Sequence, residues 1–255
     1  MARVVVTGSA SGMGAAIRKR LEGAGNRVVG LDLRDAEILA DLAVPGERVR
    51  AVARVREFFP DGLDRLVLCA GLGPHVKPPS RIAAVNYFGA VDLLDGLFPL
   101  LRRGEKPAAV VIGSNSAHVL PVDDHPYVLA LLEHDEPRAL ALVDEAGDSV
   151  LAYVGSKNAV GKAVRRRALE WGRAGVRLNA VAPGPTDTPM LEAGLADPET
   201  GEAIRGFVAP IARHGRPEEV AALVDFLLGD DASWIHGAVY FVDGGMDAQL
   251  RPDRY

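Results

Sequence analysis

The sequence predicts an α/β fold in which one doubly wound parallel sheet of about seven strands carries helices on both faces. Short runs of β-branched residues alternate along the chain with longer segments of helical periodicity, which is the pattern of such a sheet. Of the 255 residues, 48% are hydrophobic and 25% are charged, which is typical of a globular protein and not of a disordered one. A length of about 250 residues is common for one α/β domain, and no repeat or linker divides the chain, so we expect a single domain over residues 1–255.

Each expected element follows from its local pattern. Short apolar, β-branched runs indicate buried strands, whereas apolar residues that recur about every three or four positions indicate helices. The expected strands are residues 4–6, 28–31, 38–40, 66–68, 108–112, 176–181 and 239–242. The expected helices are residues 15–24, 49–58, 82–101, 157–171 and 218–228. The connection between the second and third strands is too short for a helix, so we expect only a turn there.

The composition excludes several classes of protein. The longest apolar runs, such as Ala108–Ile112, are far shorter than the ~20 residues that span a bilayer, so we expect no membrane association. A single cysteine, Cys69, excludes a disulfide framework and suits a reducing compartment. The N-terminus shows no signal-peptide pattern, so we expect a cytoplasmic protein.

The net charge of −5 is spread unevenly. Residues 119–150 contain eight acidic residues and one basic residue, Arg138, so the rest of the chain is close to neutral. The sequence shows no basic stripe of the kind that binds a phosphate backbone, and we expect no nucleic-acid partner. The six histidines show no metal-ligand spacing, and we expect no metal.

A glycine-rich segment, Thr7–Gly14, lies between the first expected strand and the first expected helix. Glycines at positions 8, 12 and 14 let the chain turn sharply and bring backbone N–H groups close to a pyrophosphate, and the helix N-terminus adds partial positive charge. A purely structural strand–helix turn also uses glycine. The position directly after an N-terminal strand favours dinucleotide binding.

An acidic residue ends the second expected strand at the distance that dinucleotide binding requires. Asp32 lies 18 residues after Gly14, and a carboxylate there accepts hydrogen bonds from ribose hydroxyls and repels a 2′-phosphate. A strand-end aspartate that makes a turn is the structural alternative. Arg34 weakens the prediction, because a nearby arginine neutralises a 2′-phosphate. We expect NAD in preference to NADP.

Tyr153 and Lys157 form the sharpest signal for catalysis. Residues four apart lie on one face of a helix, so the lysine ammonium is expected near the tyrosine phenol. A phenol titrates near pH ~10, and a neighbouring cation lowers that pKa toward the range in which it works as a base. A Tyr-x-x-x-Lys pair alone often occurs by chance, but in a chain that also has a dinucleotide-binding loop it indicates a dehydrogenase.

These residues together resemble the short-chain dehydrogenase/reductase family, and the resemblance covers nearly the whole chain. The matching motifs are residues 7–14, Asn86, Gly113-Ser114, Tyr153 with Lys157, residues 183–188, residues 216–221 and residues 243–245. The resemblance implies a Rossmann-type fold and a catalytic set of Asn86, Ser114, Tyr153 and Lys157. It implies NAD binding by Gly8, Ser11, Gly12, Met13, Gly14, Asp32, Leu33, Asp41, Leu42, Ala70, Gly71, Tyr153, Lys157, Pro183, Gly184, Thr186 and Thr188.

The resemblance also implies a role for each catalytic residue. Tyr153 donates or removes the hydroxyl proton of the substrate while hydride passes between the nicotinamide and the carbinol carbon, and Ser114 hydrogen-bonds the substrate oxygen. Lys157 lowers the tyrosine pKa and binds the nicotinamide ribose. Asn86 holds a water that links Lys157 to solvent, or alternatively stabilises a bend in its helix. Ser116 is the alternative to Ser114, which we prefer because it lies directly at the strand end.

Two features depart from the family pattern. Cys69 replaces a structural asparagine, and we interpret it as a small buried residue that is not a nucleophile. Ser114 and Tyr153 are 39 residues apart, because residues 119–150 form an insertion with two short helices, 127–133 and 138–146, separated by Pro137 and the acidic run Glu133–Glu136. This insertion is expected near the active-site entrance and over the face through which relatives assemble. We therefore expect a homodimer formed through residues 218–228 and 239–242.

The substrate is expected to be a bulky, apolar secondary alcohol or ketone, such as a 3α-hydroxysteroid or 3-oxosteroid. Several apolar residues follow the 183–188 loop and form either a mobile lid over such a substrate or ordinary core packing. They are Met190, Leu191, Leu195, Ile204, Phe207 and Val208. His118 is expected at the surface, although it is close enough in sequence to Ser114 to line the substrate entrance. The alternatives are reduction of another small cyclic ketone or an acyl intermediate, and a non-catalytic NAD sensor.

Overall fold

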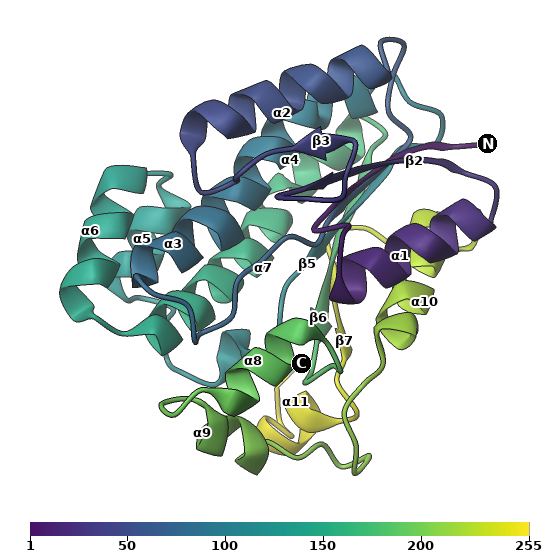
Figure 1. The fold of residues 1–255 in the computed structure, drawn as a ribbon. Helices are drawn as coiled ribbons and strands as arrows, with labels where there is room; N and C mark the ends of the chain where they lie inside the picture. Colours follow the sequence, from purple (N-terminus) through teal and green to yellow (C-terminus); the bar gives the residue numbers. More distant parts are fainter. Residues whose placement is uncertain (255) are drawn as a thin grey trace.

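A single parallel sheet organises the protein. The computed structural model describes residues 1–254, and within them seven strands pair in the order β3-β2-β1-β4-β5-β6-β7 (Figure 1). The strands are β1 Arg3–Thr7, β2 Arg27–Asp32, β3 Ile38–Leu39, β4 Arg65–Leu68, β5 Ala108–Ile112, β6 Arg177–Pro183 and β7 Val239–Val242. All neighbouring strands are parallel, which confirms the predicted fold class.

The order of the strands reverses at β1. The chain moves outward from β1 to β2 and β3, and then returns to the other side of β1 to form β4. Connections therefore leave the carboxyl ends of β1 and β4 in opposite directions and leave a crevice between them. In an open α/β sheet this crevice is where ligands bind, and both the glycine-rich segment and Cys69 follow these two strand ends.

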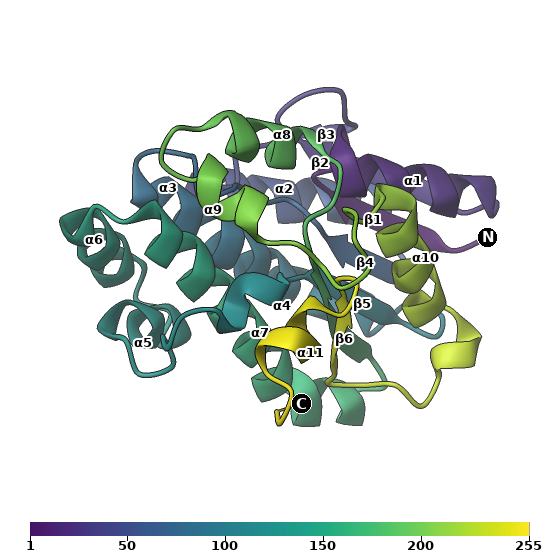
Figure 2. The same cartoon turned by 90° about the horizontal axis from the view of Figure 1, so that it is seen from below.

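Helices cover both faces of the sheet, as the alternation of side chains along β1 requires. Val5 packs into the larger apolar core, whereas Val4 and Val6 pack into the second core on the other face. The main helices are α1 Gly12–Gly23, α2 Pro45–Phe58, α4 Ala90–Leu101, α7 Ser149–Arg173 and α10 Pro217–Leu228. Helices α1 and α10 lie side by side on the second core, and α2, α4 and α7 cover the larger one (Figures 1 and 2).

The long helix expected at residues 82–101 is divided in the structure. It begins as α3 Pro79–Ala83, continues through a π-helical turn, Ala84–Gly89, and ends as α4. The stretch Pro79–Leu101 is long and apolar enough to cross a membrane, but 72% of its apolar window is buried inside the fold. Its apolarity is therefore accounted for by its place in the core.

The insertion forms two helices, as predicted, α5 Pro126–Leu132 and α6 Glu136–Ala146. They pack against α3 and α7 at one side of the molecule (Figure 1). The prediction that Pro137 separates the helices is wrong, because this proline occupies the first turn of α6, where its missing N–H costs no hydrogen bond. Helix α7 also begins eight residues earlier than expected, where the Asp148 carboxylate accepts hydrogen bonds from the N–H groups of Val150 and Leu151.

Several short elements were not expected. Near the carboxyl edge of the sheet they are a 3-10 turn at Asn115–His118 and the helices α8 Pro189–Ala196, α9 Gly201–Gly206 and α11 Met246–Leu250. At the amino edge there is a 3-10 turn at Asp230–Ala232. Helices α8 and α9 belong to the segment that follows β6 (Figure 2). They are too short for periodicity to reveal them.

Candidate active site

The glycine-rich segment turns so tightly that side chains are sterically excluded at two of its positions. Gly8 has a φ of +67°, and a Cβ there would lie 2.8 Å from the backbone of Ala70. A Cβ on Gly14 would lie 1.9 Å from the carbonyl oxygen of Gly8. The segment therefore needs glycine at both positions in order to pass between the ends of β1 and β4.

Thr7 holds these two strand ends together. Its buried Oγ1 accepts hydrogen bonds from the N–H groups of Cys69 and Ala70, each at 3.0 Å. The first intrahelical hydrogen bond of α1 runs from the Ala15 N–H to the Ser11 carbonyl, so the preceding N–H groups at the helix N-terminus are free to bind a ligand. This arrangement suits an anion such as a pyrophosphate.

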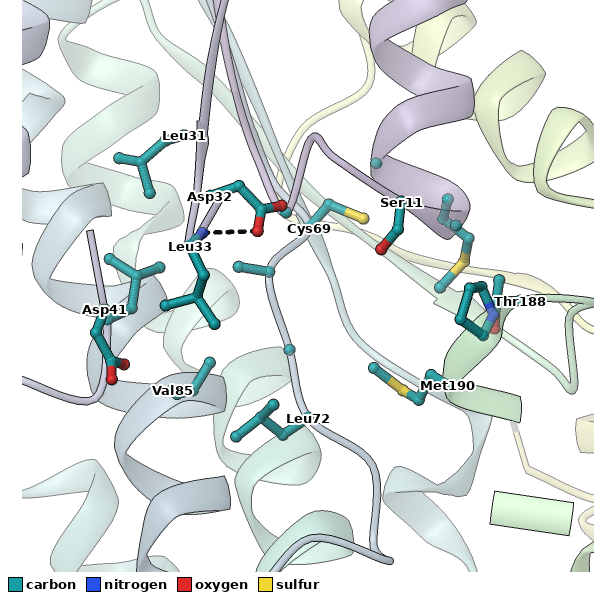
Figure 3. Close-up of a pocket in the computed structure, with 18 of the residues that line it drawn as sticks. Ser11, Leu31, Asp32, Leu33, Asp41, Cys69, Leu72, Val85, Thr188 and Met190 are labelled. Atoms are coloured by element: carbon teal, nitrogen blue, oxygen red, sulfur yellow. Dashed lines mark hydrogen bonds between the residues drawn. The ribbon is translucent and has the colours of Figure 1, made fainter. Parts of the chain in front are cut away.

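A pocket of about 170 Å³ opens in front of the glycine-rich segment (Figure 3). Asp32 lies on its wall at the end of β2, where its Oδ2 accepts from the Ala10 N–H at 3.0 Å and its Oδ1 from the Leu33 N–H at 2.7 Å. Arg34 is exposed and lies outside the lining of the pocket. The carboxylate of Asp32 is therefore held by backbone groups and not by this arginine.

Beyond Asp32 the pocket continues toward Asp41, Leu42 and Arg81 (Figure 3 labels Asp41). Arg81 Nη2 donates to Asp41 Oδ2 at 2.9 Å, and the Ala43 N–H donates to Asp41 Oδ1 at 2.9 Å. Burial acts to raise the pKa of Asp41, but these two hydrogen bonds outweigh burial and lower it. Asp41 is thus an ionised side chain with a fixed orientation at the far end of the pocket.

The hydroxyl groups of Ser114, Ser116 and Tyr153 meet beside β5. Ser114 follows the last residue of β5, and its Oγ lies 2.7 Å from Ser116 Oγ. Burial raises the pKa of Tyr153, and hydrogen bonding by Ser114 and Ser116 lowers it by less, so that the net shift is upward. In this arrangement the two serines are the groups that lower the pKa of the phenol, and the predicted effect of Lys157 on it stays a prediction.

The ammonium of Lys157 is directed elsewhere. Its Nζ donates a hydrogen bond to the carbonyl oxygen of Ile112, the last residue of β5, at 3.0 Å. Burial lowers the pKa of Lys157 to about 8. A Cβ on Gly71 would lie 3.5 Å from this Nζ, so the ammonium reaches the crevice just behind the first pocket.

Asn86 lies in the π-helical turn and holds the chain that follows β4. Its Oδ1 accepts from the Leu72 N–H at 2.7 Å, and its Nδ2 donates to the Leu72 carbonyl at 3.0 Å and to Ser156 Oγ at 3.3 Å. A Cβ on Gly71 would lie 3.3 Å from Asn86 Oδ1, which places this amide next to Lys157. Within this arrangement the amide fixes the backbone between the pocket and the lysine.

A second cavity of about 280 Å³ opens over Ser114 and Tyr153. Its walls are mostly apolar and include Pro74, Val119, Val150, Leu191, Ile204 and Phe207. Three side chains line both cavities, namely Met13, Thr188 and Met190. The two spaces are therefore neighbours, with the Ser114 and Tyr153 hydroxyls on the side of the second one.

The apolar residues after the 183–188 loop divide between two environments. Met190, Leu191, Ile204 and Phe207 line the second cavity from α8 and from the end of α9, and each is only half-buried. Val208 is 60% exposed. Of the two predicted interpretations, core packing is therefore wrong for these residues, because none of them is buried in either apolar core.

Most residues predicted to bind NAD surround the two cavities. The first pocket is lined by Gly8, Ser11, Gly12, Met13, Gly14, Asp32, Leu33, Asp41, Leu42, Ala70, Gly71 and Thr188. The second cavity is lined by Tyr153, Pro183, Gly184 and Thr186, and Lys157 lies behind both. Reasoning from sequence missed Leu31, Ala40, Cys69, Leu72, Arg81, Val85, Pro189 and Met190, which also line the first pocket. Packing of α3, of the π-helical turn and of α8 brings four of these into place, and no sequence signal marks them as cofactor-binding residues.

Two further expectations concern Cys69 and His118. The prediction that Cys69 is buried holds for its thiol, whereas the residue as a whole is half-buried and lines the first pocket. Burial of its thiol raises the pKa to about 12, which makes it a poor nucleophile, as expected. His118 is exposed and packs against the ring of Phe241, so it lies at the surface, as expected.

The chain is similar to dehydrogenases over its whole length. A family model described as enoyl-(acyl carrier protein) reductase matches residues 140–247. The 3-alpha-hydroxysteroid dehydrogenase/carbonyl reductase of Comamonas testosteroni is 49% identical over 257 residues, which cover 100% of both chains. The 3beta-hydroxysteroid dehydrogenase 1 of Eggerthella lenta is 30% identical and covers 95% of this chain and 92% of its own.

A solved structure is also closely similar. The crystal structure of the 3-alpha-hydroxysteroid dehydrogenase from Pseudomonas sp. B-0831, complexed with NADH, has a TM-score of 0.97 and 49% identity, and the match covers 99% of each chain. The insertion at 119–150, with residues 32–37 and 68–74, is the sequence pattern that most resembles bacterial enzymes of this kind, and the identity to the Comamonas protein confirms the resemblance.

Proposed function

The chain belongs to the short-chain dehydrogenase/reductase family, and we propose that it is an NAD(H)-dependent oxidoreductase that interconverts a bulky, apolar secondary alcohol and its ketone. The observation that carries this proposal is the position of the Ser114 and Tyr153 hydroxyls, which lie beside the junction of a nucleotide-shaped pocket and an apolar cavity. The names of the two relatives that are 49% identical support the same activity.

The residues of the first pocket fit a dinucleotide. The N–H groups at the start of α1 suit the diphosphate, and Asp32 suits the two hydroxyls of the adenosine ribose. Beyond Asp32, the apolar side chains of Leu33, Leu42 and Val85 would hold the adenine base. At the other end, Met13 and Thr188 border both cavities, so the nicotinamide would face the second one. When bound, the nicotinamide supplies or accepts the hydride.

The side chains around the second cavity can transfer a proton to or from the substrate oxygen. Because its pKa is raised, the Tyr153 phenol is protonated at neutral pH and is ready to donate a proton to a ketone oxygen. Ser114 donates to the same oxygen, where negative charge develops. Lys157 holds the β5 end through Ile112, and its Nζ, next to Gly71, would hold the nicotinamide ribose. Asn86 orients the backbone next to this lysine.

The second cavity favours a large apolar substrate. Its lining residues are mostly hydrophobic, and a rigid polycyclic molecule loses little conformational entropy when it enters such a space. We place 3-oxosteroids and 3α-hydroxysteroids first among the candidate substrates, because the relatives from Comamonas and Pseudomonas are 3-alpha-hydroxysteroid dehydrogenases.

A coupled assay tests the proposal directly. NADH oxidation is followed with 3-oxosteroids, cyclic ketones and quinones, and each reaction is repeated with NADPH. We expect turnover with a 3-oxosteroid and a clear preference for NADH. NADH binding without turnover of any ketone or alcohol would contradict the proposed activity. It would favour the alternative of a non-catalytic NAD-binding protein.

We also propose a cytoplasmic homodimer formed through α10 and β7. Helices α5 and α6 cover the side of α7, and the insertion carries a net charge that opposes its own copy across a two-fold axis. On the α10 and β7 side, Phe226 is 44% exposed and Trp234 is 98% exposed. Light scattering measures the mass of the protein and of a variant without residues 119–147. A tetramer joined through α4 and α7 would contradict this assembly.

A further inference from the structure

A buried arginine joins the insertion to the far end of the first pocket. Arg48, in the first turn of α2, is only 1% exposed. Its Nη1 and Nη2 donate to the two carboxylate oxygens of Glu136, the first residue of α6, at 2.9 and 2.5 Å. Its Nη1 also donates to Asp92 Oδ2 at 2.8 Å. The inserted helix α6 is thus tied to α2 and α4 by a single guanidinium.

The same guanidinium holds the backbone of the pocket. Arg48 Nε donates to the carbonyl of Leu42 at 2.7 Å, and Nη2 donates to the carbonyl of Ala43 at 3.3 Å. Leu42 packs closely against Gly89 at the end of the π-helical turn, where a Cβ on Gly89 would lie 2.9 Å from the Leu42 Cβ. The backbone of Leu42 in the pocket wall is therefore held by Arg48, while its side chain packs against Gly89.

Helix α6 reaches the pocket by a second route at its other end. The carboxylate of Asp144, in the last turn of α6, accepts a hydrogen bond from the Ser80 N–H at the start of α3, at 2.8 Å. The next residue of α3 is Arg81, which donates to Asp41 at 2.9 Å. Asp41 and Leu42 are neighbours in the pocket wall, so the two ends of α6 act on adjacent residues.

The guanidinium of Arg48 is buried between two acidic partners, Glu136 and Asp92. Burial acts to lower the pKa of this guanidinium, but Glu136 and Asp92 outweigh burial and raise it. A buried cation that loses one of two acidic partners shifts toward the other one, since an unpaired buried charge is costly. Loss of the Glu136 charge would therefore draw Arg48 toward Asp92 and away from the two backbone carbonyls.

We infer that α6 positions the adenine end of the cofactor site, with Glu136 and Asp144 as positioning residues that touch neither cofactor nor substrate. This inference rests on the proposed function, because Asp41 and Leu42 contact the adenine only if a dinucleotide lies in the first pocket. It assigns the insertion a part in cofactor affinity, in addition to its place beside the entrance.

Binding of ADP-ribose isolates this end of the site, because the compound lacks the nicotinamide. Calorimetric titration compares the wild-type protein with Glu136→Gln, Asp144→Ala and the control Glu133→Gln, whose ion pair with Arg138 stays within the insertion. We expect each of the first two variants to raise the ADP-ribose Kd by about three- to tenfold, the usual range for such coupling. The control should bind like the wild type.

Kinetic and thermal measurements separate positioning from damage to the fold. At saturating NADH, kcat and the ketone KM of both variants should equal those of the wild type, while the NADH KM rises with the ADP-ribose Kd. Asp144→Ala should lower Tm slightly, because the Ser80 N–H loses its acceptor, while kcat at saturating NADH stays that of the wild type. A lower Tm together with a lower kcat would instead indicate a structural role and overturn the inference.

The outcomes distinguish this inference from the proposed function. Equal ADP-ribose affinities in the wild type, Glu136→Gln and Asp144→Ala would overturn the inference and leave the proposed function intact. A wild-type protein that binds neither ADP-ribose nor NADH would contradict the proposed function, and the inference with it.

Discussion

Lys157 and Ile112 are joined across the interior of the protein, with the lysine Nζ donating to the carbonyl oxygen at 3.0 Å. One residue belongs to α7 and the other ends β5, so the bond fixes the helix that carries Tyr153 to the strand that precedes Ser114. The ammonium is buried, and its pKa is lowered to about 8. The lysine is therefore held in its place at a cost in folding free energy.

Replacing this lysine should make the protein more stable and inactive. Its pKa falls from 10.5 to about 8, so folding is penalised by about 3 kcal/mol below pH 8, and the penalty disappears as pH rises toward the unfolded value. Lys157→Met removes that penalty but leaves the Ile112 carbonyl unpaired, which costs about 1–2 kcal/mol. Urea unfolding should show a net gain of about 1–2 kcal/mol near neutral pH that turns into a loss of about 1–2 kcal/mol at alkaline pH, where only the unpaired carbonyl still counts, with turnover lost. A less stable variant at neutral pH would refute this account of the lysine.

Tyr153→Phe should abolish turnover and leave NADH binding nearly unchanged, because only the proton donor is lost. In the wild type, the raised pKa keeps the phenol protonated across neutral pH, so ketone reduction should stay flat there. Alcohol oxidation needs the phenolate and should rise with pH over the same range. Comparing rates with normal and deuterated NADH shows whether hydride transfer limits the measured rate. A fall in ketone reduction between about pH 7 and 8 would show instead that the phenol pKa is lowered.

Asp32→Asn should weaken the preference for NADH over NADPH. The amide keeps the shape and still accepts from the Ala10 N–H, but it no longer repels a 2′-phosphate. We expect the ratio of the two kcat/KM values to fall by about tenfold or more, equivalent to ~1.4 kcal/mol. Arg34→Gln is the matched control, because this arginine is outside the pocket lining and its removal should leave the ratio unchanged. Equal efficiency of the wild type with both cofactors would remove the basis of this prediction.

His134→Asn should reduce stability only at acidic pH. The hydrogen bond from His134 to Asp92 raises the pKa of the imidazole, so its contribution is full below pH 6.5 and is lost as pH rises through the raised value. Asparagine tolerates the positive φ of 61° at this position. Both groups are partly exposed, so the difference in unfolding free energy should stay below ~1 kcal/mol and be larger at about pH 5.5 than at pH 8. A difference that does not change with pH would point to the ring contact with Phe88 alone.

The strands of the sheet and the glycine-rich segment were predictable, because buried β-branched runs and sterically required glycines are local signals. The start of α7 was predictable in principle, since Gly147, with a φ of +65°, is followed directly by the capping residue Asp148. The other features of the site depend on how distant parts of the chain pack together, which no local pattern shows. Arg81 and Val85 join the pocket only because the stretch that begins with α3 crosses it, and the direction of the Lys157 ammonium depends on where β5 ends.

The side chains of Met13, Thr188 and Met190 form a wall common to both cavities. A ligand that presses on this wall from one side changes the surface offered to a ligand on the other side. The affinities of cofactor and substrate are then linked, and by thermodynamic reciprocity each ligand alters the affinity of the other by the same factor. Selectivity for a substrate is in this sense a property of the binary complex, and replacing any one of these three side chains would change both equilibria together.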